Sequence, residues 1–199
     1  HAGLRPGRDM AISLDIAASE FGEGGRYRLG LETRELDTAQ LIELLGGWLD
    51  AYPIVSIEDP LAEDDEAGMV EFTRRFGRRV QIIGDDYLVT AAARIDHAAA
   101  LPACNCALIK PNQAGTVSET RAALAAARRA GWATVISARS GETEDVAIAH
   151  LAVGWNAGQL KVGSFARSER MAKWNECLRI EEALGARARF AGRTALAID

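Results

Sequence analysis

The feature that most constrains the fold is an alternation of short apolar runs with amphipathic segments along nearly the whole chain. Apolar runs typical of strands buried on both faces occupy 10–17, 54–60, 80–86, 106–112, 132–141 and 158–164. Helical spacing of apolar residues predicts helices over 38–52, 66–77, 91–101, 117–131, 144–155 and 168–184. A strand–helix repeat of this kind predicts a parallel sheet covered by helices, which is an α/β fold.

Composition narrows the class further. The 199 residues are 48% hydrophobic, which is enough for one sizeable core. No G-x-G-x-x-G follows the first strand and there is no P-loop, so a (β/α) barrel or an open doubly wound sheet remains. A net charge of −5 does not support nucleic-acid binding, and no apolar run approaches the ~20 residues that span a bilayer.

Each predicted strand ends, on its carboxyl side, at a charged residue. These residues are Asp15, Glu58, Asp85, Lys110, Arg139 and Lys161. In a barrel they would converge on one mouth, where the active sites of such folds lie, whereas an open sheet would spread them along an edge. We therefore expect a barrel with its functional site at that mouth.

The strand count falls short of a closed barrel. About six strand–helix units are visible, while a closed barrel of this type has eight, and an unclosed sheet leaves edges exposed. The chain starts at His1 rather than at Met, so we expect a truncated or processed start with two further strands upstream. The segment 185–199 is rich in Gly, Ala and Arg and receives no assignment.

Three of the strand-end residues are acids. Asp15, Glu58 and Asp85 would repel one another at one mouth unless a cation lies among them, and hard oxygen ligands suit Mg²⁺. Any one of them alone is better explained as a helix cap or a partner of arginine. For three at successive strand ends, the metal interpretation is favoured.

Two of the strand-end residues are lysines. Lys110, beside a metal-bound substrate and near a second ammonium, can release its proton and act as a base, and Lys161 would be that second ammonium. The alternative for either is a lysine that extends its ammonium into solvent. We expect both to be catalytic.

The polar loop SARSGETED (137–145) runs into a predicted helix. Backbone amides at Ser140 and its neighbours can hold an anion, and Arg139 can grip a phosphate through its forked guanidinium. Thr143 or Glu142 can also cap a helix that begins near Glu144, and both interpretations can hold together.

Cysteine spacing argues against a zinc site. Cys104, Cys106 and Cys177 are an odd number with no CxxC pair, and His97 and His150 do not complete a known ligand pattern. Reduced thiols are the better interpretation, and we expect a cytoplasmic protein.

Six strings resemble enolase signatures and occur in enolase order. They are LDIAASEF (14–21), YPIVSIEDPLAEDD (52–65), GDDYLVT (84–90), LIKPNQAGTVSET (108–120), SARSGETED (137–145) and GQLKVGSFARSERMAKWNECLRIEEALG (158–185). The resemblance covers nearly the whole chain. It implies that 1–199 form part of the C-terminal catalytic barrel of an enolase, an enolase-type TIM barrel whose first strands and N-terminal domain are not included.

The resemblance also implies roles by position. Asp15, Glu58 and Asp85 match the carboxylates that hold the tightly bound Mg²⁺, and a second Mg²⁺ would arrive with the substrate. Lys110 matches the base that takes the alpha proton of 2-phosphoglycerate in its dehydration to phosphoenolpyruvate. The substrate contacts are Lys161 to the carboxylate, and Arg139 and Ser140 to the phosphate.

Two departures from the enolase pattern leave alternatives open. Enolases usually carry His where this chain has Ala138, and the glutamates that handle the leaving hydroxide lie in the missing part, so we expect 1–199 alone to be inactive. The first hypothesis is an enolase acting in glycolysis, which would be a homo-oligomer at full length with a small phosphorylated substrate. The second is an enolase-like paralogue acting on a related phosphorylated or phosphonylated hydroxy acid. The third is a non-catalytic binding protein that keeps the fold.

Overall fold

The central element of the computed structural model, which describes residues 2–198, is a six-stranded sheet in which every pair is parallel. The strands follow one another in the sheet in the order β1 (Ile12–Asp15), β5 (Ile54–Glu58), β6 (Gln81–Gly84), β7 (Cys106–Ile109), β8 (Ala133–Ser137) and β9 (Gly158–Lys161). All six predicted strands are present, each shorter than its predicted run. This confirms the α/β half-barrel expected from the sequence.

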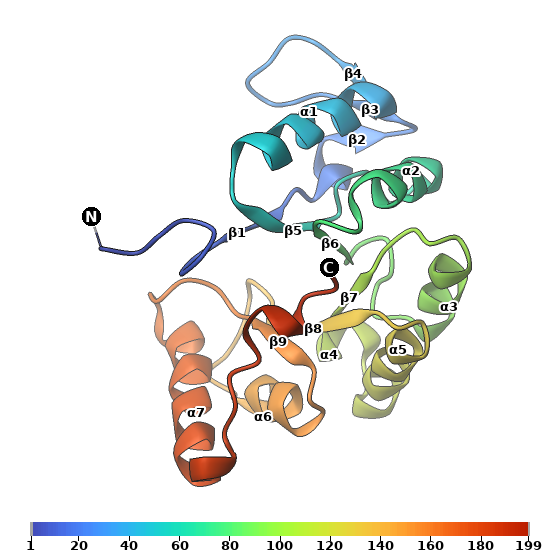
Figure 1. Cartoon of the computed structure of the whole chain (residues 1–199). Helices are drawn as coiled ribbons and strands as arrows, with labels where there is room; N and C mark the ends of the chain where they lie inside the picture. The colour runs from blue at the N-terminus through green and yellow to red at the C-terminus, as the bar shows by residue number, and fades with distance from the viewer. Residues whose placement is uncertain (1, 199) are drawn as a thin grey trace.

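Helices connect the strands and cover the outside of the sheet (Figure 1). The six predicted helices are α1 (Thr38–Ala51), α2 (Glu66–Phe76), α3 (Ala92–Ala100), α5 (Val117–Arg129), α6 (Ala147–Gly154) and α7 (Ser168–Leu184). A single extra turn, α4 (Pro111–Ala114), follows β7 and starts with proline at its first position, where the missing N–H costs nothing. In the described chain, no helix is both long and apolar enough to cross a membrane.

Local sequence explains where three of the helices begin. Asp37 and Gln40 form a reciprocal capping box at the start of α1. The side chain of Asp65 accepts the N–H of Gly68 at the start of α2, and Thr116 caps α5 in the same way. Each such cap stabilises its helix by about 1 kcal/mol, because it satisfies an amide that the helix leaves unpaired.

The two faces of the sheet carry different cores. Ile57, Ile82 and Ile136 pack with the helices in one large buried cluster. The opposite face holds a small second cluster made of strand residues alone, Ile83, Cys106, Leu108 and Val135. Because strand side chains alternate between faces, this second cluster is the interior of the half-barrel, and Asp85 and Lys110 continue its inward-facing series beyond the strand ends.

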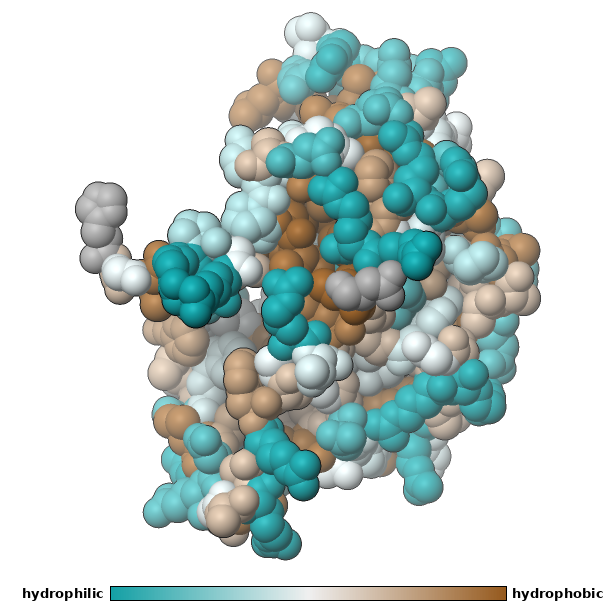
Figure 2. Space-filling model, in the orientation of Figure 1, coloured by the Kyte–Doolittle hydropathy of each residue, from teal (hydrophilic) through white to brown (hydrophobic). Residues whose placement is uncertain are grey.

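The sheet curves until its first and last strands approach each other, as Figure 1 shows. Nζ of Lys161 on β9 donates a hydrogen bond of 2.8 Å to Oδ2 of Asp15 on β1. Across the interior, Gln159 donates to Gln81 at 2.8 Å, and it also donates to the carbonyl of Ala195 at 2.9 Å. The C-terminal segment therefore packs against the amino ends of the strands. Figure 2 shows hydrophobic residues in the middle of the face in view, bordered by hydrophilic ones.

Three local features differ from the sequence predictions. The long connection after β1 contains a small antiparallel sheet of β2 (Gly22–Glu23), β3 (Arg26–Tyr27) and β4 (Leu36–Asp37), which was not predicted. Helix α6 begins at Ala147 rather than near 144. The unassigned tail forms two 3₁₀ turns, Gly185–Arg187 and Gly192–Ala195, and residue 199 lies outside the described residues.

Candidate active site

The charged residues predicted to converge do lie at the carboxyl ends of the strands. Asp15, Glu58 and Lys161 are the last residues of their strands, Asp85 and Lys110 follow theirs directly, and Arg139 lies just beyond β8. Because neighbouring parallel strands end at the same edge, this sequence pattern alone brings acids and lysines to one mouth.

Lys161 joins the two acids that belong to neighbouring strands. Its Nζ lies 2.8 Å from Oδ2 of Asp15 and within 2.8 and 2.7 Å of the two oxygens of Glu58. The Glu58 side chain is only 3% exposed, whereas that of Lys161 is 40% exposed. The ammonium thus caps a buried carboxylate from its solvent side.

Lys110 and Asp85 form the second pair. The ammonium of Lys110 donates to Oδ2 of Asp85, and both side chains are nearly buried. The backbone N–H of Lys110 donates to Oγ1 of Thr90 at 3.0 Å, and that hydroxyl donates to Gln113 at 2.6 Å. The start of the Lys110 side chain is therefore fixed from the backbone side, while its tip meets a carboxylate.

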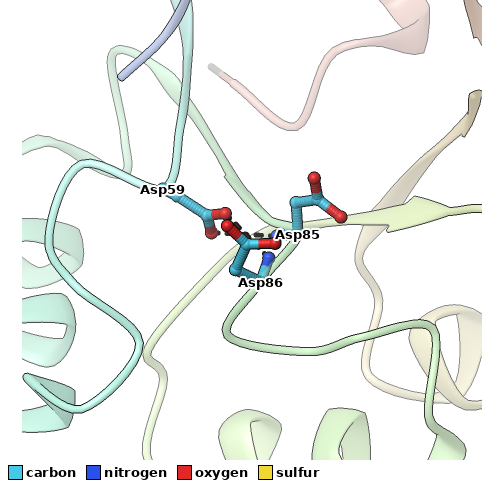
Figure 3. A group of neighbouring side chains, drawn as sticks. All are labelled: Asp59, Asp85 and Asp86. Carbon is cyan, nitrogen blue, oxygen red and sulfur yellow. Dashed lines mark hydrogen bonds between the residues drawn. The ribbon is translucent and has the colours of Figure 1, made fainter. Parts of the chain in front are cut away.

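Asp59, which the sequence analysis did not single out, organises the turn that carries Asp85. Its two carboxylate oxygens accept the N–H of Asp85 at 2.9 Å and the N–H of Asp86 at 2.8 Å (Figure 3). Its backbone has a φ of 40°, a left-handed conformation that costs a non-glycine residue of order 1 kcal/mol. The contacts around Asp59 offset that strain, and they set the direction of Asp85.

Burial dominates the electrostatics of the two central acids. Burial raises the pKa of Glu58 to about 8, against the attraction of the Lys161 ammonium, which favours the charged carboxylate. Burial likewise raises the pKa of Asp59 to about 7, against its two backbone hydrogen bonds. Burial lowers the pKa of Lys161, but attraction to Glu58 and the hydrogen bonds to Asp15 and Glu58 outweigh it, so that pKa is raised.

The donor set suits a divalent cation. Oδ1 of Asp85 is buried and lacks a hydrogen-bond partner, which costs free energy unless a cation or water meets it. Among residues 2–198, one group of three potential ligands lies within 4.8 Å, and its members are Asp59, Asp85 and Asp86. This group shares Asp85 with the set predicted from the sequence. In Figure 3 the carboxylates of Asp59 and Asp86 face each other, and that of Asp85 points away from both.

No cysteine or histidine belongs to that group within the described chain. Cys104 lies in the cluster between sheet and helices, whereas Cys106 lies in the barrel interior. His97 and His150 instead contact Glu66 and Glu176, at 2.8 and 2.9 Å. Within residues 2–198, these cysteines and histidines do not come together as one group of ligands.

Arg139 and Ser140 are exposed in the loop that follows β8, as an anion-binding role requires. The predicted cap is wrong in detail: Glu142 accepts the N–H of Arg139 at 2.8 Å instead of capping α6, which begins later with no side-chain cap. Ala138 is only 7% exposed, and its N–H donates to the carbonyl of Lys161 at 2.9 Å.

The fold and the site define a (β/α)-barrel domain with acids and lysines at the carboxyl mouth. Residues 1–198 match the family described as enolase, C-terminal TIM barrel domain. Enolase 1 of Desulfitobacterium hafniense (strain Y51) is 51% identical over 191 residues, which are 95% of this chain and 44% of that protein. The chain belongs to the enolase family, and it spans less than half the length of this curated relative.

Proposed function

We propose that this chain is the C-terminal barrel part of an enolase that dehydrates 2-phosphoglycerate to phosphoenolpyruvate with Mg²⁺. The observation that carries the proposal is the pairing of Lys110 with the half-satisfied Asp85 at the same mouth where Lys161 joins Asp15 and Glu58. Membership of the enolase family supports it, because the activity in that family is that of a lyase.

In this proposal each residue has a defined role, and Asp85 has two. Lys110 removes the alpha proton, and Asp85 orients its ammonium between turnovers. Lys161 receives the substrate carboxylate, while Arg139 and Ser140 bind the phosphate. Asp15, Glu58 and Asp85 would hold Mg²⁺, which would stabilise the negative charge that develops on the substrate carboxylate.

The test is a magnesium-dependent rise in absorbance at the phosphoenolpyruvate band. It uses the full-length protein with 2-phosphoglycerate, and EDTA as the control. A rise that EDTA abolishes supports the proposal. A folded protein that binds Mg²⁺ and gives no rise contradicts it.

Ala138 favours a second candidate function. A methyl group can neither donate a hydrogen bond nor move a proton, and this position usually holds His in enolases. A paralogue acting on a related phosphorylated or phosphonylated hydroxy acid is therefore the alternative. It predicts faster turnover on such an acid than on 2-phosphoglycerate, measured with both substrates at matched concentrations. A role as a non-catalytic binding protein gains no support, since Lys110, the proposed base, and the three acids proposed to bind the metal are present.

The remaining parts of the proposal concern the whole protein. We place it in the cytoplasm, as a homo-oligomer whose partner is a small phosphorylated substrate rather than nucleic acid or a membrane. The net charge of −5 supports the exclusion of nucleic acid. Size-exclusion chromatography with light scattering of the full-length protein tests the oligomeric state.

Replacing Lys161 with methionine should lower the unfolding free energy of the metal-free protein and increase the stabilisation that Mg²⁺ provides. Glu58 would lose its charged partner, so we expect the metal-free protein to lose about 2 kcal/mol of unfolding free energy, less than for a fully buried pair because Lys161 is 40% exposed. Without the ammonium on the Glu58 oxygens, Mg²⁺ should raise the melting temperature more than in wild type. Urea and thermal unfolding with and without Mg²⁺ measure both effects. An unchanged Mg²⁺ response would mean that Lys161 and the metal do not share Glu58.

A further inference from the structure

The chain has only three lysines, and the third lies buried beside the loop that carries Arg139 and Ser140. Of the 23 basic residues, Lys110, Lys161 and Lys173 are lysine and the rest are arginine. The side chain of Lys173, on α7, is 0% exposed. A buried ammonium is unfavourable unless it is paired and hydrogen-bonded, so its partners identify what it supports.

Three neighbouring groups contact the Lys173 ammonium, and two of these groups belong to the loop. Nζ donates to the carbonyl of Thr143 at 2.6 Å and to that of Glu169 at 3.0 Å. It also lies 3.1 Å from Oε2 of Glu142. Two hydrogen bonds and one ion-pair contact thus compensate the buried charge of Lys173. Helix α7 thereby holds residues Glu142 and Thr143 through one side chain.

Glu142 carries this connection on to Arg139. While Oε2 faces Lys173, Oε1 accepts the backbone N–H of Arg139 at 2.8 Å. One carboxylate thus joins a buried cation in α7 to the backbone of the residue whose guanidinium is exposed at the mouth. Because that backbone bond fixes the start of the Arg139 side chain, loss of either partner would leave the loop freer.

The chemistry of the position favours lysine over arginine. A compact ammonium directs its donors to three acceptors from one atom, whereas a planar guanidinium spreads five donors over a wide fork. The surface cations of this chain are overwhelmingly arginine, and lysine is kept at two site positions and at this enclosed one.

We propose that Lys173, acting through Glu142, is a positioning residue that holds Arg139 and Ser140 in the arrangement that binds the substrate phosphate. The inference rests on the proposed function, since it assigns the phosphate to this loop. It adds a residue remote from the reacting atoms whose effect should appear in phosphate affinity rather than in the chemical step.

The test uses the full-length protein with Mg²⁺, two test variants, their double variant and one control variant. Lys173→Met replaces the buried ammonium with an apolar chain of similar length. Removing one partner of a buried pair is destabilising, but the freed Glu142 side chain, 19% exposed, can turn to water and reduce that cost. Glu142→Ala removes the bridge without touching the buried cation, and it serves if Lys173→Met does not fold. His150→Gln is the matched control, because it breaks a different contact of α7, that of Glu176 with His150 on α6.

Three readouts separate positioning from general stability. Hydrogen–deuterium exchange of a peptide covering 137–146 should be faster in both test variants and unchanged in His150→Gln. The Kd for inorganic phosphate, measured by calorimetry, should rise about tenfold in both test variants. The KM for 2-phosphoglycerate should rise by a similar factor while kcat falls less. The double variant should lose no more than the worse single one, because both act on one connection.

Folded variants with unchanged exchange and unchanged phosphate affinity would overturn the proposal, as would a wild-type protein that binds no inorganic phosphate. Failure of the proposed function looks different. In that case wild type binds phosphate but does not dehydrate 2-phosphoglycerate, and the exchange and phosphate readouts still decide the role of Lys173.

Discussion

Replacing Lys110 with alanine is expected to abolish exchange of the substrate's alpha proton with solvent, by about 10⁴-fold, which is the upper range for loss of a general base. The reason is geometric: its ammonium is held against Asp85 at the mouth, and its side chain is only 12% exposed, so water cannot easily take its place. The measurement is deuterium incorporation at the alpha carbon of 2-phosphoglycerate, followed by NMR in D₂O with the full-length protein.

The same variant should keep its fold and its Mg²⁺ binding. Removing an ammonium from Asp85 leaves that carboxylate more available to a cation, so affinity should not fall. Thermal unfolding and a Mg²⁺ titration are the controls. Exchange that survives in Lys110→Ala, in a protein that folds and binds Mg²⁺, would assign the base to another residue.

The main elements of the fold were predictable because their signals are local. The predicted run 106–112 begins with four residues that are apolar on both faces and contains Pro111, which stops the strand. This is the pattern of a strand buried between a barrel interior and helices. Since neighbouring parallel strands end at one edge, correct strand ends were sufficient to bring Asp15, Glu58 and Lys161 into contact. No knowledge of side-chain packing was needed for that step.

Features that depend on distant contacts were not predictable. The strands β2, β3 and β4 have two residues each, too few for a period-two pattern, and they are held by contacts such as Tyr27 OH to Asp65 at 2.7 Å. In the sequence, Asp59 is simply one more acidic residue after a strand. Only its hydrogen bonds across to the turn after β6 reveal what it does.

The burial of Lys173 also could not be predicted from the sequence. On α7 it occupies a helix whose described residues otherwise include none that are fully buried, so helical periodicity gives no reason to expect a buried cation there. Two of its three partners, Thr143 and Glu142, come from the loop after β8, about thirty residues earlier in the chain. A pairing over that separation becomes visible only when the loop and the helix are placed in space.

Replacing Asp85 with asparagine is expected to weaken Mg²⁺ binding by about 100-fold. The change keeps the shape of the side chain but removes one charge beside a divalent ion, which by Coulomb's law costs several kcal/mol at an effective dielectric constant of about 20, before water offsets part of it. It also directs an amide group toward the position where Oδ1 is buried without a partner. Calorimetric titration of the metal-free full-length protein with Mg²⁺ measures the change.

Two further variants decide which acids complete the site around Asp85. The strand-end set includes Asp15, whereas the tightly spaced group in Figure 3 includes Asp86. We expect Asp15→Asn to weaken Mg²⁺ binding on the order of tenfold and Asp86→Asn by less than about threefold, because a neighbouring charge that is not a ligand acts only through a screened field.

The strand-end set is favoured because both oxygens of Asp59 already accept backbone N–H groups, which leaves that carboxylate fewer lone pairs for a metal. The opposite ranking of Asp15→Asn and Asp86→Asn would place the cation between Asp85 and Asp86. In that arrangement Lys161 could keep Asp15 and Glu58 as partners while the metal is bound, and its ammonium would not be released to meet the substrate carboxylate. The order of these two variants therefore tests the role of Lys161 as well as the ligand set.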